Sequence, residues 1–239
     1  MKKKLLIFTA TYNEKNNIKI FLNNFIKLSL NADLLIIDDN SPDKTSEVIK
    51  QYQKKNENIK LIIRKKKEGL NTAHQLAFKI CKNNKYKYLI TLDSDLTHDV
   101  KILPKFIRKI KFYSFVIGSR YVRGGRTDIT GWRFLTSYVG NKFIKHIFKI
   151  KINEFTSSYR AFNLTKLKNI DFDKIKSNGY SFFMEVVYQI NKMNYSMHEF
   201  PIHAKQRFKG NSKIPKIELF RTLFNILRLK LKEYLINYR

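Results

Sequence analysis

The sequence predicts an α/β fold with a mostly parallel central sheet flanked by helices, and three observations support this prediction. The chain has 239 residues, of which 43% are hydrophobic, and that composition is enough to build a buried core. Short apolar runs alternate with stretches of helical periodicity, as they do in successive βαβ units. Polar and acidic residues follow three of these runs, where a parallel strand would end.

The first half of the chain carries the clearest alternation. Its helical stretches show apolar side chains three and four residues apart, as at Ile18, Phe21 and Phe25. We expect strands at residues 5–8, 34–37, 59–63, 88–92 and 115–118, and helices at 16–28, 45–53, 71–82 and 100–110. Parallel strands joined through helices need right-handed crossovers, so the expected sheet is Rossmann-like.

The second half is less regular. A loop rich in glycine and arginine spans residues 120–131. Helices are expected at 132–148, 180–192 and 217–238, and strands at 155–162 and 196–202. The last of these helices carries an apolar stripe with cations between its members, which is typical of a helix at a membrane interface. Packing on the core or a dimer contact is the alternative. We therefore divide the chain into a main domain, residues 1–213, and an amphipathic helix, residues 214–239.

The charge of the chain is extreme. The formal net charge is +29 and the isoelectric point is near 10.1, which indicates an anionic partner: nucleic acid, a phospholipid surface or a phosphorylated substrate. Lysine provides 37 of the 48 cationic side chains, a bias that an AT-rich genome also produces. The 19 acidic residues are therefore the more informative ones.

Cysteine content and hydropathy bear on the compartment. The single cysteine, Cys81, lies in an apolar helical stretch and is expected to be a buried thiol. One cysteine excludes a disulfide framework and favours a reducing compartment. The apolar run near the N-terminus is too short for a secretory signal, and no window of 18 residues is apolar throughout, so we expect no transmembrane helix.

Three groups of polar and acidic residues are expected at one edge of the sheet. They are residues 12–14, Asp38 with Asp39, and Asp93 with Asp95. Any one group is compatible with a helix cap or a turn, but three together in an acid-poor chain favour a ligand site. Two carboxylates spaced as Asp93 and Asp95 prefer a hard divalent cation, Mg²⁺ or Mn²⁺, which completes its shell with substrate phosphates. This predicts a nucleotide-activated donor. The sequence has no Walker A or G-x-G-x-x-G pattern, which disfavours an NTPase or a dinucleotide enzyme.

Eight short motifs follow one another in a recognisable order. They are Thr11–Glu14 (TYNE), Ile37–Asp43 (IDDNSPD), Gly69–Ala73 (GLNTA), Asp93–His98 (DSDLTH), Gly118–Gly125 (GSRYVRGG), Thr156–Arg160 (TSSYR), Gly179–Tyr180 with Met184–Glu185, and Glu199–Ile202 with Arg207 and Ser212–Lys213. The set resembles the family 2 glycosyltransferases, and within them the polyprenol-phosphate (dolichol-phosphate) mannosyltransferases. The resemblance runs from residue 5 to about residue 213.

The resemblance implies a GT-A fold and an inverting transfer of a sugar from a nucleotide-sugar to a lipid phosphate. The donor is usually GDP-mannose, and residues 1–213 would be the catalytic domain. Asp93 and Asp95 would ligate the metal, with Thr97 as a further ligand where relatives often have Gln or Ser. The remaining donor contacts implied by the motifs are Ala10, Tyr12, Glu14, Ile37, Asp39, Ser94, Arg120, Arg207 and Lys213.

The acceptor side is implied by a cluster of arginines. Four of the 11 arginines fall between residues 120 and 133, and the planar guanidinium suits phosphate oxygens. The resemblance places Arg120, Arg133 and Ser137 on the acceptor phosphate, and Asp93, Asp95 and Arg120 at the reacting centre. No general base is expected, because a lipid phosphate is already an anion and needs only positioning.

Two other functions stay open at this point. The first is transfer of glucose or another sugar from a UDP-sugar to a lipid phosphate or a glycan. The second is a basic protein without catalysis that binds nucleic acid or lipid. A nucleic-acid reader leaves the paired acids unexplained and shows no reader motif, so we expect no nucleic-acid partner. We expect instead a cytoplasmic enzyme, peripheral on the cytoplasmic face of an anionic membrane.

Overall fold

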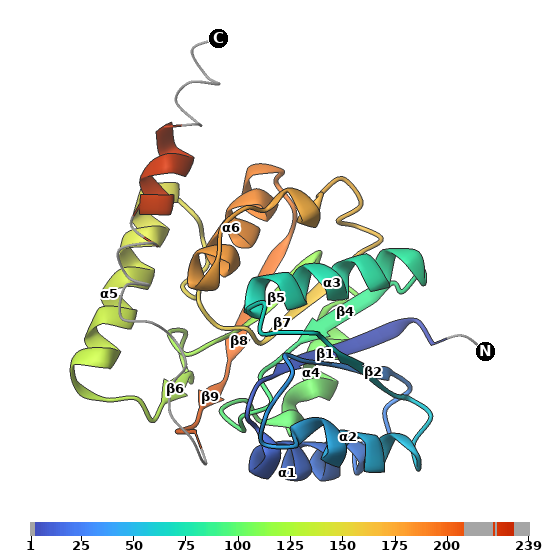
Figure 1. Ribbon diagram of the computed structural model, residues 1–239. Helices are drawn as coiled ribbons and strands as arrows, with labels where there is room; N and C mark the ends of the chain where they lie inside the picture. The colour runs from blue at the N-terminus through green and yellow to red at the C-terminus, as the bar shows by residue number, and fades with distance from the viewer. Residues whose placement is uncertain (1–2, 208–221, 223, 232–239) are drawn as a thin grey trace.

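The computed structural model describes residues 3–207, 222 and 224–231. Its main feature is a mixed sheet of seven strands in the order β3-β2-β1-β4-β7-β5-β8, with helices on both faces (Figure 1). The strands are β1 (Leu5–Thr11), β2 (Asp33–Asp38), β3 (Ile59–Ile63), β4 (Tyr88–Thr91), β5 (Phe115–Ser119), β7 (Arg160–Asn163) and β8 (Met197–Pro201). A small second sheet pairs β6 (Arg126–Thr127) with β9 (His203–Ala204). The α/β fold expected from the sequence is confirmed.

The helices lie close to where the periodicity placed them. They are α1 (Lys15–Ile26), α2 (Thr45–Gln53), α3 (Leu70–Asn83), α4 (Leu103–Lys109), α5 (Gly131–Phe148) and α6 (Gly179–Lys192), with 3₁₀ turns at Val100–Ile102 and Phe172–Lys174. The expected helix over 100–110 therefore begins as a 3₁₀ turn. Asp99 caps this turn by accepting a hydrogen bond from the Lys101 amide at 2.9 Å.

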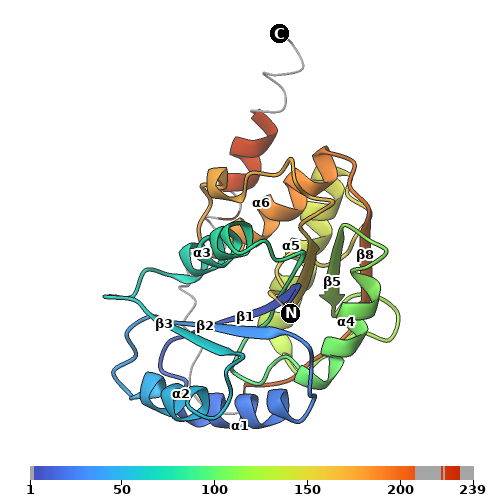
Figure 2. The ribbon, with the colours of Figure 1, turned by 90° about the vertical axis from the view of Figure 1, so that its right-hand side faces the viewer.

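Two hydrophobic cores enclose the sheet, one on each face. Figure 2 shows α1 and α2 on one side of it and α3 and α6 on the other. Alternate residues of β1 divide between the cores: Ile7 packs with Phe21 on the α1 side, and Phe8 packs with Ala77 on the α3 side. Cys81 lies in the second core with a free, fully buried thiol, as expected. Strands buried on both faces explain the continuous apolar runs of the sequence.

Strand register brings the polar loops to one edge. Thr11 at the end of β1 pairs with Asp38 at the end of β2, and Phe8 pairs with Thr91 at the end of β4. All these strands run parallel, so the residues that follow them emerge together. The antiparallel exception is β7, which lies between β4 and β5.

One expected strand is wrong in its extent. The sequence predicted a strand over 155–162, but β7 covers only Arg160–Asn163. In the preceding loop, side chains take the place of a strand partner: the Phe155 amide donates to Asn141 Oδ1 at 2.7 Å, and the Thr156 amide to Glu154 Oε1 at 3.1 Å. These local hydrogen bonds satisfy the backbone without a ladder.

The predicted C-terminal helix is described only in part. Residues 222 and 224–231 are helical, and the rest of the predicted stretch lies outside the described residues. Ile226 and Leu229 are buried in the core, whereas Phe224, Leu227 and Leu231 are exposed. In the described parts of the chain, none of the helices combines the length and the hydropathy needed to span a membrane.

Candidate active site

The loops after β1, β2 and β4 meet at the carboxyl edge of the sheet. Each contains a residue with left-handed backbone: Asn13 at φ 57°, Asn40 at φ 56° and Leu96 at φ 69°. Asparagine tolerates this conformation, but a leucine there is strained. Leu96 lies directly after the Asp93–Asp95 pair, and backbone strain of this kind gathers at functional loops.

Asp38, the last residue of β2, is fully buried beneath the loops at the carboxyl edge of the sheet. Its carboxylate accepts hydrogen bonds from Thr11 Oγ1 at 2.8 Å, the Ser41 amide at 2.9 Å and Ser41 Oγ at 2.6 Å. These bonds tie the end of β1 to the loop after β2. Asp38 is therefore a structural residue, whereas its neighbour Asp39 faces a different set of partners.

Asp39 is paired with an arginine that the motifs did not reveal. Arg64, directly after β3, contacts the Asp39 carboxylate through Nε and Nη2, and both side chains are buried. The same guanidinium donates to Thr72 Oγ1 at 2.6 Å and to the Gly69 carbonyl at 3.0 Å. The Gly69 amide donates to Asp39 Oδ2 at 3.2 Å. Asp39 is thus fixed against the start of α3.

Asp93 and Asp95 follow β4 as predicted. Asp95 Oδ1 accepts from the Thr97 amide at 3.1 Å and from Thr97 Oγ1 at 2.6 Å, which closes a tight turn. The Asp93 amide donates to His98 Nδ1 at 3.1 Å, so that ring nitrogen acts as an acceptor. Although 38% of the Asp93 side chain is open, surrounding protein atoms desolvate the carboxyl and raise its pKa; His98 opposes this rise and Asp95 adds to it.

Arg207 reaches this edge from a distant part of the chain. Its Nη2 lies 2.7 Å from Asp95 Oδ2, and its Nη1 donates to Glu14 Oε1 at 2.9 Å. The segment that carries it runs beside the Asp93–Asp95 loop, because the Lys205 amide donates to the Thr97 carbonyl at 3.0 Å. One guanidinium therefore joins two of the predicted donor residues.

The carboxylates suit a divalent cation that brings further ligands with it. In the portion of the chain that the structure covers, no cluster of three or more His, Cys, Asp or Glu side chains could enclose a metal ion. A pair of oxygen ligands beside open space matches Mg²⁺ or Mn²⁺, which retain water or take phosphate oxygens. The Arg207 guanidinium that pairs with Asp95 shows that the surroundings of this carboxylate can hold a cation.

Arg120 follows β5 and forms a two-point ion pair with Glu154. Its Nε lies 2.7 Å from Glu154 Oε2, and its Nη2 lies 2.8 Å from Oε1 and 2.7 Å from Thr156 Oγ1. Glu154 is fully buried. Burial alone would raise the pKa of Glu154, but the charge of Arg120 and hydrogen bonds from Arg120 and Thr156 outweigh it and lower the pKa.

A second carboxylate fixes this pair. Glu199 in β8 accepts from the Glu154 amide at 2.9 Å through Oε1 and from Asn153 Nδ2 at 3.0 Å through Oε2. Burial raises the pKa of Glu199, and these hydrogen bonds oppose the rise. The loop that holds Arg120 is thereby anchored to the far strand of the sheet. Arg120 is consequently held in one orientation rather than displayed as an open cation.

The predicted acceptor residues lie on the first turns of α5. Arg133 is exposed, and Ser137 Oγ lies 2.8 Å from the hydroxyl of Tyr121, next to Arg120. The Arg120 guanidinium carbon lies 4.9 Å from the Tyr121 ring centroid. Tyr121 therefore connects Arg120 to Ser137, whereas the exposed Arg133 forms no ion pair with the described residues.

The other predicted residues divide into three groups. Ser94 Oγ donates to the Ala10 carbonyl at 3.2 Å, and Lys67 Nζ lies 4.4 Å from the Tyr12 ring, so these residues line the edge. The Ile37 side chain is fully buried in the core, which leaves only its backbone for a ligand. Lys213 lies outside the described residues.

Motif reading missed Arg64 and Glu154, and it included Glu199 in a motif without giving it a supporting role. Two signals were present: arginine is scarce in this lysine-rich chain, and acids are scarcer than cations. Their pairing joins residues 25 and 34 positions apart, and spacing in the sequence does not show such contacts.

Comparison with known families identifies the fold at this point. Residues 6–171 match the model of a family described as glycosyl transferase family 2. The crystal structure of glucosyl-3-phosphoglycerate synthase from Mycobacterium tuberculosis in complex with Mn²⁺, UDP-glucose and glycerol 3-phosphate superposes with a TM-score of 0.68 at 12% identity. The alignment covers 95% of this chain and 79% of that one. The expected GT-A-like fold is confirmed.

Two curated relatives align over most of the chain. An undecaprenyl-phosphate mannosyltransferase from Micrococcus luteus is 28% identical over 214 residues, covering 88% of this chain and 87% of the relative. A polyprenol monophosphomannose synthase from Mycolicibacterium smegmatis is 26% identical over 224 residues, covering 92% and 84%. Both alignments extend beyond the part matched by the family model.

Proposed function

The chain belongs to glycosyl transferase family 2 and is a glycosyltransferase, and from this premise we propose that it transfers mannose from GDP-mannose to a polyprenyl monophosphate. The observation that carries the proposal is the carboxyl edge of the sheet, where Asp39 follows β2, Asp93 and Asp95 follow β4, and Arg207 joins Asp95 to Glu14. Both curated relatives are named for this class of transfer. The proposed reaction inverts the configuration at the anomeric carbon.

We assign the donor to the loops after β1, β2 and β4. Ala10, Tyr12, Glu14, the Ile37 backbone and Asp39 would hold the nucleoside. Ser94, Arg120, Arg207 and Lys213 would contact the phosphates. Asp39 is well placed for a ribose because Arg64 and the Gly69 amide fix its carboxylate.

Asp93 and Asp95 would hold a divalent cation, with Thr97 as the third ligand. When bound, such a cation acts as a Lewis acid that stabilises charge on the departing diphosphate. Thr97 already donates both its amide and its hydroxyl to Asp95, which keeps that carboxylate oriented. Mn²⁺ in the structure of the Mycobacterium tuberculosis synthase supports this assignment, and Mg²⁺ offers the same chemistry.

The acceptor phosphate would lie between Arg120 and the first turns of α5. Arg133 and Ser137 would orient it, and Tyr121 keeps Ser137 beside Arg120. A phosphate monoester is ionised at neutral pH, so its oxygen attacks without a general base. The pairing of Arg120 with Glu154 holds the guanidinium in place before either substrate arrives.

The lipid acceptor places the reaction at a membrane surface. We propose that residues 1–213 form the catalytic domain and that the helix after it meets the anionic cytoplasmic face as a peripheral contact. The exposed Phe224, Leu227 and Leu231 of the described part support an interfacial role for that helix.

A donor screen tests the proposed function. Purified protein is incubated with Mn²⁺, a polyprenyl phosphate and one of three radiolabelled donors: GDP-mannose, UDP-glucose or UDP-GlcNAc. We expect a lipid-linked product from GDP-mannose. A product from UDP-glucose alone would favour the related glucosyl transfer. No product from any donor would contradict the lipid-phosphate acceptor.

A further inference from the structure

A basic pocket lies at the C-terminal end of α5, away from the carboxyl edge of the sheet. Its volume is about 660 Å³, and it is lined by Lys142, Lys145, His146, Lys149, Ile150 and Lys151. The described residues of the lining include no acid. Among the described residues, no carboxylate forms an ion pair with His146 or with any of the four lysines that line the pocket. Within the described part of the chain, four lysines without a compensating acid therefore surround one pocket, and such a pocket suits an anion.

Lysines near a helix C-terminus are stabilising in themselves, because they oppose the helix dipole. That effect explains the presence of a lysine at position 145, whose Nζ also donates to Asn153 Oδ1 at 2.6 Å. It does not explain Lys151, which lies beyond the helix and faces the same pocket. The convergence of helix and post-helix lysines on one cavity points to a ligand.

The same helix carries an apolar stripe on its outer surface. Trp132, Leu135, Val139 and Phe143 recur three or four residues apart, and their exposures are 76%, 46%, 54% and 43%. Large apolar side chains in one exposed row mark an interaction surface. Lys142 follows Val139 of this stripe by three residues and so lies next to it on the helix, and Lys149 follows directly after the helix ends.

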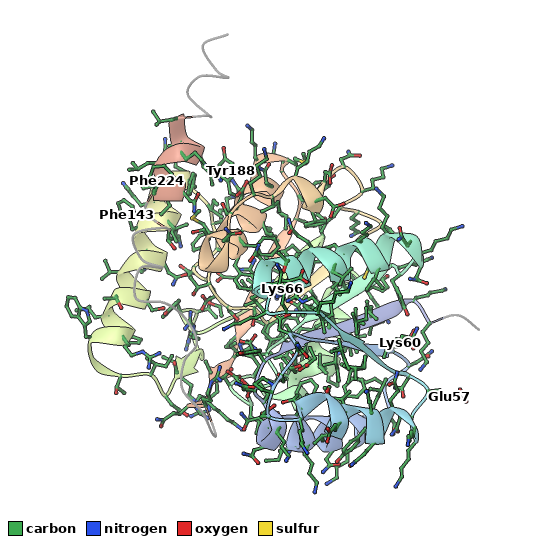
Figure 3. The ribbon with its side chains drawn as sticks, in the orientation of Figure 1. Glu57, Lys60, Lys66, Phe143, Tyr188 and Phe224 are labelled. Atoms are coloured by element: carbon green, nitrogen blue, oxygen red, sulfur yellow. The ribbon has the colours of Figure 1, made fainter. Side chains whose placement is uncertain are left out.

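The helical segment 224–231 extends this surface. Lys230 Nζ lies 5.6 Å from the Phe148 ring, so the segment packs at the end of α5. It exposes Phe224, Leu227 and Leu231. Figure 3 shows Phe143 and Phe224 on the same side of the molecule. Two helices thus offer exposed apolar residues beside one basic pocket.

We propose that this side of the molecule lies on an anionic membrane, with the pocket holding a phospholipid headgroup phosphate and the α5 stripe entering the interface. This inference rests on the proposed lipid acceptor. Apolar residues beside lysines match a bilayer, which offers hydrocarbon directly beneath anionic headgroups. A second copy of the chain would bring two lysine clusters together, and like charges disfavour that contact.

The pocket is separate from the proposed acceptor site. Arg133, in the first turn of α5, lies 16 residues before Lys149, which caps the other end of the helix; this corresponds to about 24 Å along the helix axis. One phosphate cannot contact both. The pocket therefore binds a membrane lipid that is not consumed, and this lipid holds α5 on the surface while Arg133 meets the acceptor.

Trp132 is the single tryptophan of the chain, so its fluorescence reports directly on the stripe. The full-length protein is titrated with vesicles of phosphatidylcholine alone and with vesicles that also contain phosphatidylglycerol. We expect a blue shift with the anionic vesicles and quenching by lipids brominated in the acyl chain. Binding without a blue shift or quenching would overturn the proposed insertion of α5.

A charge variant tests the pocket. In K142Q/K149Q/K151Q three lining lysines lose their charge, while Lys145 keeps its contact with Asn153. The matched control, K50Q/K54Q/K55Q, removes three exposed lysines at the end of α2. At about fivefold per lysine near the surface, the pocket variant should lose on the order of 100-fold in vesicle affinity, and the control much less. Equal losses would overturn the pocket as the site. Circular dichroism confirms that both variants fold.

Two further arms separate the possible sources of failure. Excess inorganic phosphate should leave vesicle binding by the wild type nearly unchanged at constant ionic strength; complete competition would identify a free anion as the ligand and overturn the headgroup proposal. Mannose transfer to a detergent-solubilised acceptor should be retained by the pocket variant. If the wild type makes no lipid-linked sugar but still inserts Trp132, the proposed function fails while the membrane contact stands.

Discussion

The two parts of the site that we propose for the donor and for the acceptor, the donor half and the acceptor half, are built differently. After β2 and β4 the carboxylates are tied to their own loops: Asp38 accepts three hydrogen bonds and Asp95 two from Thr97. The first turns of α5 instead expose Trp132 and Arg133. The proposed donor half is therefore organised by contacts within the protein, whereas we propose that a lipid surface completes the acceptor half.

The largest expected effect breaks the donor half. Asp95→Ala removes a proposed metal ligand and should reduce mannose transfer on the order of 1000-fold, because the Lewis-acid contribution is several kcal/mol. The rate is measured at saturating Mn²⁺. The fold should persist, since the Asp95 carboxylate bonds only within its own turn and to Arg207 among the contacts described above.

The matched control lies at the opposite edge of the same sheet. Asp33, at the start of β2, contacts the Tyr86 hydroxyl and pairs with Lys60 at 3.2 Å and Lys3 at 3.6 Å. Asp33→Asn should lower the free energy of unfolding and leave the transfer rate of the folded protein intact. Comparable activity in the two variants would contradict the metal assignment.

The acceptor half is tested by Arg133→Ala. Loss of one charge-assisted contact should raise the KM for polyprenyl phosphate about 10- to 100-fold, with the KM for GDP-mannose nearly unchanged. Arg108→Ala, an exposed arginine on α4, is the control. If both Michaelis constants rise together in Arg133→Ala, the separation of the two halves is wrong.

Arg207 tests how the donor half is held before the donor binds. Because its guanidinium lies 2.7 Å from Asp95, it competes with a divalent cation for that carboxylate. Arg207→Ala should therefore tighten Mn²⁺ binding about tenfold in the absence of donor, measured by electron paramagnetic resonance of free Mn²⁺. The same variant should bind GDP-mannose more weakly. Unchanged or weaker Mn²⁺ binding without donor would rule out this competition.

The last expected effect is on stability rather than on activity, and it concerns the core behind the proposed donor half. His74 on α3 contacts the rings of Phe8 and Phe183, and burial, together with the charge of Arg160, lowers its pKa to about 3. Between that value and the unfolded value near 6.5, the unfolded chain binds a proton that the native protein does not. Stability should consequently fall as pH falls, by about 1.4 kcal/mol per unit.

His74→Phe should remove that slope, as measured by urea unfolding between pH 5 and pH 7. The ring of phenylalanine suits the aromatic surroundings and carries no proton. His198→Phe, at a partly exposed site, serves as the control and should leave most of the slope in place. A slope that persists in His74→Phe would assign the pH dependence to another group.

The sequence predicts the features that depend on local patterns, and it does not show the contacts that form between distant residues. The apolar run at 34–37 located β2 because a parallel strand inside the sheet is buried on both faces, and the run at 59–63 located the edge strand β3, which is only partly buried. The Asp93–Asp95 pair located the edge because carboxylates are scarce in this chain. The supports were not predictable: Glu154 holds Arg120, and Arg64 holds Asp39, through contacts that only the folded chain creates.

The α5 helix shows the opposite case. The periodicity of its sequence correctly predicted a helix over 132–148. The search for amphipathic helices, however, assigned membrane contact only to the predicted C-terminal helix, residues 214–239. Exposed apolar residues at 132, 135, 139 and 143 look like a core stripe in sequence. Only the arrangement of neighbouring helices shows that nothing among the described residues buries them.

The central claim is that Asp93 and Asp95 hold a divalent cation between the protein and the donor diphosphate. Its most direct test is calorimetric binding of GDP-mannose to the wild type and to Asp95→Asn, each with Mn²⁺ and with EDTA. We predict that EDTA weakens binding to the wild type about tenfold or more and leaves the weak binding to Asp95→Asn unchanged. Equal affinity of the wild type in Mn²⁺ and in EDTA would contradict the account.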